Sequence, residues 1–160
     1  MTLEQRAAVL LEECRSQGIK IATAESCTGG MLSSLLTSVP GSSDVFDCSF
    51  VTYSNEAKKR MLGVSHELIA EHGAVSRACA LAMAHGAILE SAATLAISIT
   101  GVAGPGGGTT AKPVGLVHFA FASRNGATLH REERFGDVGR AGVRTASVEV
   151  ALELLEAQIL

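Results

Sequence analysis

The sequence predicts an α/β fold built on a mixed, mostly parallel sheet of about five strands. Three short apolar segments of strand type alternate with helical segments, and helices between sequential strands imply parallel crossover connections. Later in the chain, two β-rich segments flank Asn125-Gly126, a hairpin signal that adds at least one antiparallel strand. A length of 160 residues suits one domain with a sizeable core, so we expect a single domain over residues 1–160.

In the first half of the chain, apolar residues at helical spacing alternate with apolar runs of strand type. The expected elements are, in order, a helix over residues 3–17, a strand over 19–24, a helix over 29–38, a strand over 48–53, a helix over 55–61 and a short helix between 65 and 73. Gly18 is placed to end the first helix, and Thr28 is placed to cap the second.

In the second half, a long helix, a central strand and a hairpin precede a final helix. The expected elements are a helix over residues 76–91, a strand over 95–100, a glycine-rich loop over 101–110, strands over 114–123 and 128–135, and a helix over 140–159. Ser76 is placed to cap the first of these helices. The run at 95–100 is apolar enough for a central strand that is buried on both faces.

The charge and cysteine content exclude several classes of protein. A formal net charge of −3 with 18% charged residues argues against a broad nucleic-acid surface. No apolar run reaches the roughly 18 residues of a membrane span, and the charged amphipathic start is unlike a signal peptide. The four cysteines show no CxxC spacing, so we expect reduced thiols, a cytoplasmic location and no zinc site. The apolar last helix favours a homodimer.

No metal site is indicated by the histidines. None of them pairs with Asp, Glu or Cys at the spacing of metal ligands, so we expect these side chains to be structural or solvated. They are His66, His72, His85, His118 and His130.

Ser26 is the leading candidate for a nucleophile. It lies in a Ser/Thr/Gly turn directly after the strand at 19–24, in the position where open α/β sheets bind ligands. The N–H groups of the same turn, around Thr28 and Gly29, can cradle an anion. A serine nucleophile needs a base, and neither Gly-x-Ser-x-Gly nor Ser-x-x-Lys is present here. A helix cap at Ser26 and a nucleophilic thiol at Cys27 stay open as alternatives.

Tyr53 and Lys58 follow the second expected strand, so they can face the turn that contains Ser26. If Lys58 is partly desolvated, its neutral amine can take the proton of the serine hydroxyl. The phenol of Tyr53 can relay that proton or pass it to a leaving group. The alternative is that Lys58, Lys59 and Arg60 form a solvated basic run on a short helix.

A glycine-rich loop begins after Thr100, at the end of the third expected strand, and includes Gly101, Gly104 and Gly106. It matches neither the Walker A motif nor the dinucleotide fingerprint. Clustered glycines expose N–H groups that can form a nest for a phosphate or an oxyanion. A flexible connection between strands is the alternative.

Two further segments carry groups that suit a phosphate. Hydroxyl and N–H groups come together in a turn that contains Gly41, Ser42 and Ser43. Arg140 and Arg144 lie near the expected start of the last helix, where an arginine suits a phosphate. A simple chain turn and a surface ion pair are the alternatives.

Six ordered segments resemble the CinA carboxy-terminal domain family, which is tied to competence/damage-inducible proteins and includes nicotinamide mononucleotide deamidases. They lie at residues 24–30, 39–43, 53–58, 73–76, 100–109 and 112–115, and the first two read Ala-Glu-Ser-Cys-Thr-Gly-Gly and Val-Pro-Gly-Ser-Ser. The resemblance runs from about residue 19 to the last helix. It implies a three-layer α/β/α sandwich that hydrolyses the carboxamide of nicotinamide mononucleotide, a small-molecule substrate, without a cofactor.

The resemblance also implies roles for the residues singled out above. Ser26 would be the nucleophile, Lys58 the general base and Tyr53 its partner in proton transfer. Thr100 and the glycine loop would bind the reacting amide and its oxyanion. The nucleotide phosphate would be held by Gly41, Ser43 and Arg140. Two other functions stay open: a non-catalytic module that binds a nucleotide or phosphate, and a serine amidase with another substrate.

Overall fold

The computed structural model describes residues 1–160 and contains one five-stranded sheet. Its elements, in chain order, are α1 (Leu3–Gln17), β1 (Ile21–Glu25), α2 (Met31–Thr37), the 3-10 helix η1 (Ser42–Asp44), β2 (Phe46–Val51), α3 (Asn55–Leu62), α4 (His66–His72), α5 (Arg77–Leu89), β3 (Leu95–Gly101), β4 (Leu116–Ser123), β5 (Thr128–Arg134) and α6 (Arg140–Ile159). Every expected helix and strand is present, and most bounds differ from the expected ones by one or two residues.

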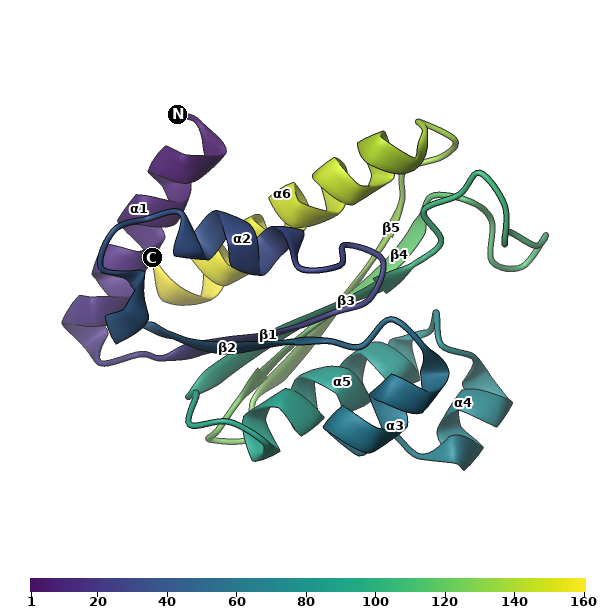
Figure 1. Cartoon of the computed structure of the whole chain (residues 1–160), viewed down its shortest axis with the longest axis horizontal. Helices are drawn as coiled ribbons and strands as arrows, with labels where there is room; N and C mark the ends of the chain where they lie inside the picture. Colours follow the sequence, from purple (N-terminus) through teal and green to yellow (C-terminus); the bar gives the residue numbers. More distant parts are fainter.

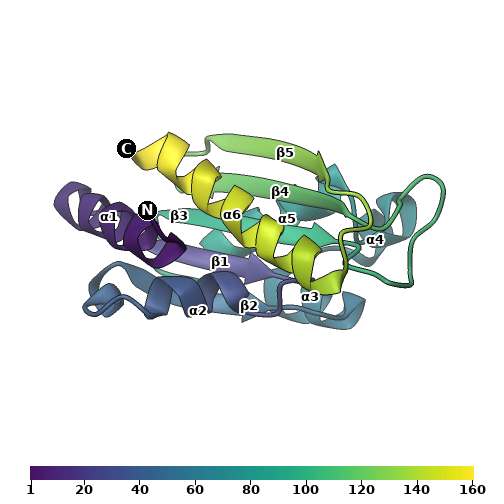
Figure 2. The ribbon, with the colours of Figure 1, turned by 90° about the horizontal axis from the view of Figure 1, so that it is seen from above.

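The strands follow the order β2-β1-β3-β4-β5 across the sheet (Figure 2). β1 pairs in parallel with β2 and with β3, whereas β3 with β4 and β4 with β5 pair antiparallel. The expected mixed sheet is therefore confirmed, but "mostly parallel" is slightly off, because two of the four pairings are antiparallel. The physical reason is that β3 returns to β4 through a loop rather than through a crossover helix.

Helices cover both faces of the sheet, as the expected three-layer α/β/α sandwich requires (Figure 1). On one face, α1, α2 and α6 pack on large strand residues such as Ile97 and Phe119. On the other face, α5 packs on small strand residues, and α3 and α4 pack against α5. The small strand residues are Ala22, Ala24, Ala96, Ala120 and Ala122. Alternate residues of a strand point to opposite faces, so each strand contributes to both cores.

The signals at helix ends are mostly as expected. Gly18 ends α1 with a φ of 68°, and Ser76 caps α5 with its hydroxyl. Thr28 as the cap of α2 is wrong, because Gly30 holds the N-cap position and offers no side chain. The hydroxyl of Thr28 donates instead to the carboxylate of Glu25, which takes over the capping of α2.

Gly86 lies where α5 packs against the end of α3. A β-carbon at this position would overlap the backbone carbonyl oxygen of Leu62. Gly86→Ala would gain about 1 kcal/mol of helix propensity, but overpacking against rigid backbone costs roughly 1–3 kcal/mol. We expect a net loss of stability, measured as a lower midpoint of urea-induced unfolding. A midpoint at or above that of the wild type would contradict close packing of α3 on α5.

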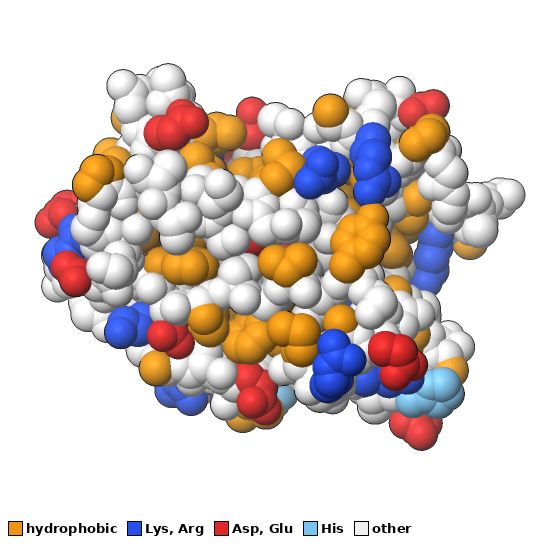
Figure 3. All heavy atoms as spheres, viewed as in Figure 1, with side chains coloured by type: hydrophobic (Ala, Val, Ile, Leu, Met, Phe, Trp, Pro, Cys, Tyr) orange, Lys and Arg blue, Asp and Glu red, His pale blue; other side chains and the backbone are white.

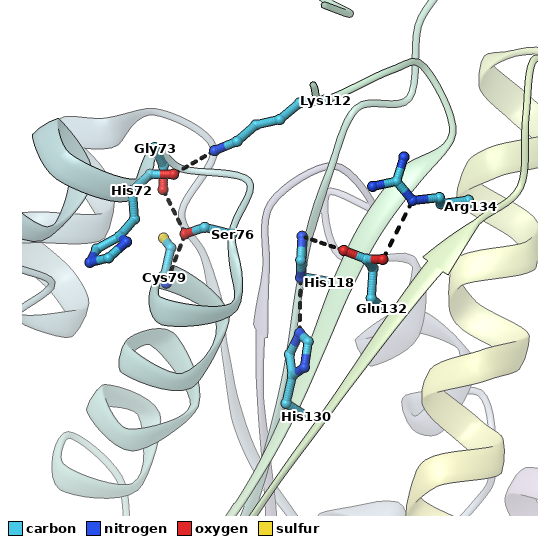
Figure 4. A network of polar contacts seen from close by, with 9 residues as sticks. All are labelled: His72, Gly73, Ser76, Cys79, Lys112, His118, His130, Glu132 and Arg134. Carbon is cyan, nitrogen blue, oxygen red and sulfur yellow. Dashed lines mark hydrogen bonds and ion pairs between the residues drawn. The ribbon is translucent and has the colours of Figure 1, made fainter. Parts of the chain in front are cut away.

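Figure 4 shows polar contacts within β4 and β5 and, apart from them, contacts around the end of α4 and the start of α5. The rings of His118 and His130 stack with centroids 5.1 Å apart, and one nitrogen of His118 lies 3.7 Å from the carboxylate of Glu132. Burial lowers the pKa of His118, so its neutral form is favoured. Lys112 donates to the backbone oxygen of His72. These contacts agree with a structural use of both stacked histidines.

The surface shows no large field of one charge sign on the face drawn in Figure 3. Acidic and basic side chains are scattered there among hydrophobic and neutral ones. No helix combines the length and the apolar character that crossing a membrane requires.

Candidate active site

A cavity of about 290 Å³ opens at the carboxyl ends of β1, β2 and β3. Open α/β sheets bind ligands at this edge. Five segments form its wall: the turn after β1, the end of β2 with the start of α3, the segment before α5, the loop after β3 and the start of α6. The residues that represent them are Ser26, Lys58, Val75, Thr100, Gly104 and Arg140.

Ser26 and Lys58 meet within this cavity. The Nζ atom of Lys58 lies 2.9 Å from the Oγ atom of Ser26. The amine also lies 2.8 Å from the backbone oxygen of Thr52 and 3.3 Å from that of Tyr53. Only 1% of Lys58 and 8% of Ser26 is exposed to solvent. The readings of Lys58 as part of a solvated run and of Ser26 as a helix cap are therefore wrong.

Strand pairing fixes the position of Ser26. Its N–H donates to the carbonyl of Ile99 in β3, and the N–H of Thr52 donates to the carbonyl of Glu25, both at 2.9 Å. These bonds continue the parallel ladder beyond the ends of β1 and β2. Ser26 is thereby held beside the segment that leads into α3.

Helix α3 brings Lys58 to the serine. Ser54 caps this helix with its hydroxyl, so α3 begins directly after β2. Lys58 lies one turn into the helix, and long helical side chains point back toward the N-terminus. That direction carries the amine to the carbonyls at the end of β2 and to Ser26.

Burial lowers the pKa of the Lys58 amine, because desolvation disfavours its charged form. Its polar contacts are a hydroxyl and two carbonyl oxygens, and no carboxylate lies among them. A neutral amine has two N–H donors for the two carbonyls and one lone pair for the hydroxyl proton. The three contacts fit the neutral amine as well as the ammonium, and the lowered pKa makes the neutral form, which can accept the proton of Ser26, more accessible.

The phenol of Tyr53 lies at the mouth of the cavity, and the side chain is 61% exposed. Its oxygen accepts a hydrogen bond from Nη2 of Arg140 at 2.8 Å, and Nη1 of Arg140 donates to the carbonyl of Gly104 at 2.8 Å. Only the backbone oxygen of Tyr53 contacts Lys58. The hydroxyl contacts the guanidinium and neither Ser26 nor the amine, so no direct relay between Ser26 and Lys58 through the phenol is present here, and proton transfer to the leaving group stays a prediction.

The loop after β3 lines the opposite wall, as expected for Thr100, Gly101, Gly104 and Gly106. The hydroxyl of Thr100 donates to the carbonyl of Ala74 at 2.8 Å and ties the segment before α5 to β3. Gly104 has a φ of 82°, a conformation that favours glycine.

Several backbone N–H groups at the cavity have no carbonyl or side-chain oxygen as acceptor, among them those of Cys27, Ala103 and Gly104. They are candidates for binding an oxyanion. The thiol of Cys27 is a poor rival to Ser26, because burial raises its pKa to about 11 and keeps it protonated at neutral pH.

Two of the residues predicted to bind substrate lie in the turn after β1 but outside the cavity. Thr28 is fully buried and donates its hydroxyl to Glu25 at 2.7 Å. Gly29 faces the guanidinium of Arg144. The direction of this turn explains both corrections, since only Ser26 and Cys27 turn toward the cavity.

Three more predicted phosphate ligands, Gly41, Ser42 and Ser43, lie at the other end of the sheet. They precede β2, and Val45 next to them pairs with the start of β1 at Ile21. Within one chain they do not line the cavity. Chain direction explains this separation, because a turn before a strand lies at the edge opposite to that strand's carboxyl end; a role of these residues in phosphate binding stays a prediction.

Sequence reasoning missed Glu25, whose carboxylate is buried beneath the turn that contains Ser26. A signal was present in the sequence. A carboxylate at the end of an apolar strand is followed by Gly29-Gly30 and a helix without a Ser, Thr, Asp or Asn at its N-cap.

The chain matches the model of the CinA C-terminal domain family over residues 3–159. Among solved structures, it is similar to the competence/damage inducible protein CihA from Agrobacterium tumefaciens, with 52% sequence identity and a TM-score of 0.95. That match covers 97% of this chain and 94% of the other.

Two kinds of relative are similar in sequence. The nicotinamide-nucleotide amidohydrolase PncC of Escherichia coli (strain K12) is 48% identical over 147 residues, which cover 91% of this chain and 88% of that protein. The CinA-like protein of Synechococcus sp. (strain RCC307) is 48% identical over 154 residues, or 96% of this chain. The chain spans only 37% of the length of that protein.

Proposed function

The chain belongs to the CinA C-terminal domain family, and from this premise we propose that it hydrolyses nicotinamide mononucleotide to nicotinic acid mononucleotide and ammonia. The observation that carries the proposal is the 2.9 Å contact between the buried amine of Lys58 and the hydroxyl of Ser26 in an open cavity. The relative named as a nicotinamide-nucleotide amidohydrolase supports the choice of substrate.

In the first step, neutral Lys58 accepts the hydroxyl proton while Oγ of Ser26 attacks the carboxamide carbon. A C–O bond forms, and the carbonyl electrons move onto oxygen to give a tetrahedral intermediate. The N–H groups of Cys27, Ala103 and Gly104, which line the cavity without a protein acceptor, would stabilise that oxyanion. One such donor contributes about 3–4 kcal/mol in comparable sites.

In the second step, the Lys58 ammonium returns its proton to the amide nitrogen. The C–N bond breaks, ammonia leaves and a nicotinoyl ester remains on Ser26. Water then attacks this ester with Lys58 again as the base, which releases nicotinic acid mononucleotide and restores the serine. Because no carboxylate stabilises the ammonium, Lys58 gives the proton back readily.

The mouth of the cavity suits the phosphate of the substrate. Arg140 uses one N–H group on Tyr53 and one on Gly104, and its guanidinium has five in all. The remaining donors are available for a phosphate oxygen. Val75 and Ala103 offer an apolar wall to the pyridine ring.

The proposal is tested by measuring ammonia release from nicotinamide mononucleotide and from nicotinamide riboside, which lacks the phosphate. We expect turnover of the mononucleotide and a kcat/KM about 10- to 100-fold lower for the riboside, the value of one charged hydrogen bond. Equal rates would instead support a serine amidase that does not use the phosphate. Binding of the mononucleotide without ammonia release would support a non-catalytic binding module.

A further inference from the structure

The turn from Ser26 to Gly30 is held by two side chains that do not line the cavity. Few backbone hydrogen bonds lie within the turn itself: the N–H of Gly29 donates to the carbonyl of Ser26 at 3.0 Å. Two successive glycines with positive φ, 56° and 103°, allow the sharp change of direction from β1 to α2. Such a turn needs outside contacts to keep one conformation.

Glu25 holds the turn on the side of α2. Its carboxylate is fully buried and accepts hydrogen bonds from the N–H groups of Gly30, Leu32 and Ser33 at 3.0–3.2 Å. It also accepts from the hydroxyl of Thr28. No Lys or Arg pairs with it, so N–H groups at the start of α2 and hydroxyl groups compensate its charge.

Arg144 holds the same turn from α6. Its Nε donates to the carbonyl of Cys27 at 3.1 Å and its Nη2 to that of Thr28 at 3.4 Å. It lies one turn after Arg140 on α6, and Arg140 binds the mouth of the cavity. Glu25 therefore accepts from Thr28 and Gly30 of the turn and from the start of α2, whereas Arg144 donates to two carbonyls of the turn.

We propose that Glu25 and Arg144 are positioning residues that keep the Oγ of Ser26 within reach of Lys58, a role that rests on the proposed function. Neighbouring residues of extended backbone point to opposite faces. Glu25 accordingly anchors on the face of α2, while Ser26 faces Lys58 on α3. A shift of the anchored residue moves the next one along the chain.

Glu25→Gln is the first test. The amide keeps the size of the side chain but turns an NH2 group toward an N–H donor of α2. We expect kcat for the mononucleotide to fall about 10- to 100-fold, as misplacement by about 1 Å does, with KM changed less than about threefold. Labelling of Ser26 by a fluorophosphonate, followed by mass spectrometry, should slow by a similar factor. Glu90→Gln, at the exposed C-cap of α5, is the matched control and should behave as wild type.

Arg144→Met is the second test and does not alter the buried site beneath the turn. It should lower kcat and the labelling rate with little change in KM, because Arg144 does not line the cavity. If a folded variant keeps the wild-type kcat and the wild-type labelling rate, the positioning role of the residue changed in that variant is overturned. Equal losses in kcat and affinity would show a general structural defect instead and also overturn it. A wild-type protein that labels at Ser26 but releases no ammonia would contradict the proposed substrate alone.

Discussion

Ser26→Ala is expected to abolish ammonia release while the protein still binds nicotinamide mononucleotide. Removing the attacking oxygen prevents the acyl-enzyme from forming, and loss of a serine nucleophile lowers kcat on the order of 10⁴- to 10⁶-fold in comparable enzymes. The change deletes one small atom beside Lys58, so the fold should persist. Single-turnover assays give the rate, and calorimetric titration gives the affinity.

The covalent intermediate provides the sharper measurement. Wild-type protein quenched during turnover should carry a nicotinoyl mass on the peptide that contains Ser26, and the alanine variant should carry none. Ser16→Ala, an exposed serine on α1, is the matched control for the loss of a hydroxyl. Ammonia release by Ser26→Ala above about a tenth of the wild-type rate would rule out Ser26 as the nucleophile.

Lys58→Met should lower kcat about 10²- to 10⁴-fold, the usual contribution of a general base. Methionine fills a similar volume in this buried position but cannot accept a proton. Lys58→Arg separates a base from a simple positive charge, because arginine is always protonated. If Lys58 acts as a base, neither variant restores turnover; recovery in Lys58→Arg would contradict that role.

The pH profile tests the same role in the unmodified protein. Turnover needs the neutral amine, and burial lowers the pKa of Lys58 below its ordinary value of 10.5. The value of kcat/KM should therefore rise with pH through that lowered pKa and then level off, and activity should be lost as the pH falls below it. The residual activity of Lys58→Met should lack this inflection. An inflection that survives the substitution would assign it to another group.

The meeting of Ser26 and Lys58 could be predicted from the sequence because both follow strands that pair in parallel. Neighbouring parallel strands bring their carboxyl ends to one edge, and composition already marks β1 and β2 as strands. The same topology argues against Gly41 and Ser43 in this cavity, since both precede β2. Their hydroxyl and N–H groups and the family resemblance suggested phosphate binding. The direction of the chain places them at the edge of the sheet opposite to the cavity.

The direction of individual side chains is what the sequence could not settle. Tyr53 pairs with an arginine 87 residues away, a contact that no local pattern encodes. Thr28 has the right chemistry for a helix cap, but the carboxyl group of Glu25 takes the N–H groups at the start of α2 instead. The lowered pKa of Lys58 likewise depends on how α3 packs, which its charged neighbours in sequence conceal.

The two arginines of α6 have a consequence for biosynthesis. Ser26 and Lys58 are translated well before Arg140 and Arg144. Arg140 contacts Tyr53 at the mouth of the cavity, and Arg144 contacts the turn that follows Ser26. A nascent polypeptide that already contains both reactive groups lacks the guanidinium groups that hold them in register. If the proposed roles hold, a growing chain would therefore not deamidate the mononucleotide until α6 has been translated and has docked on the sheet.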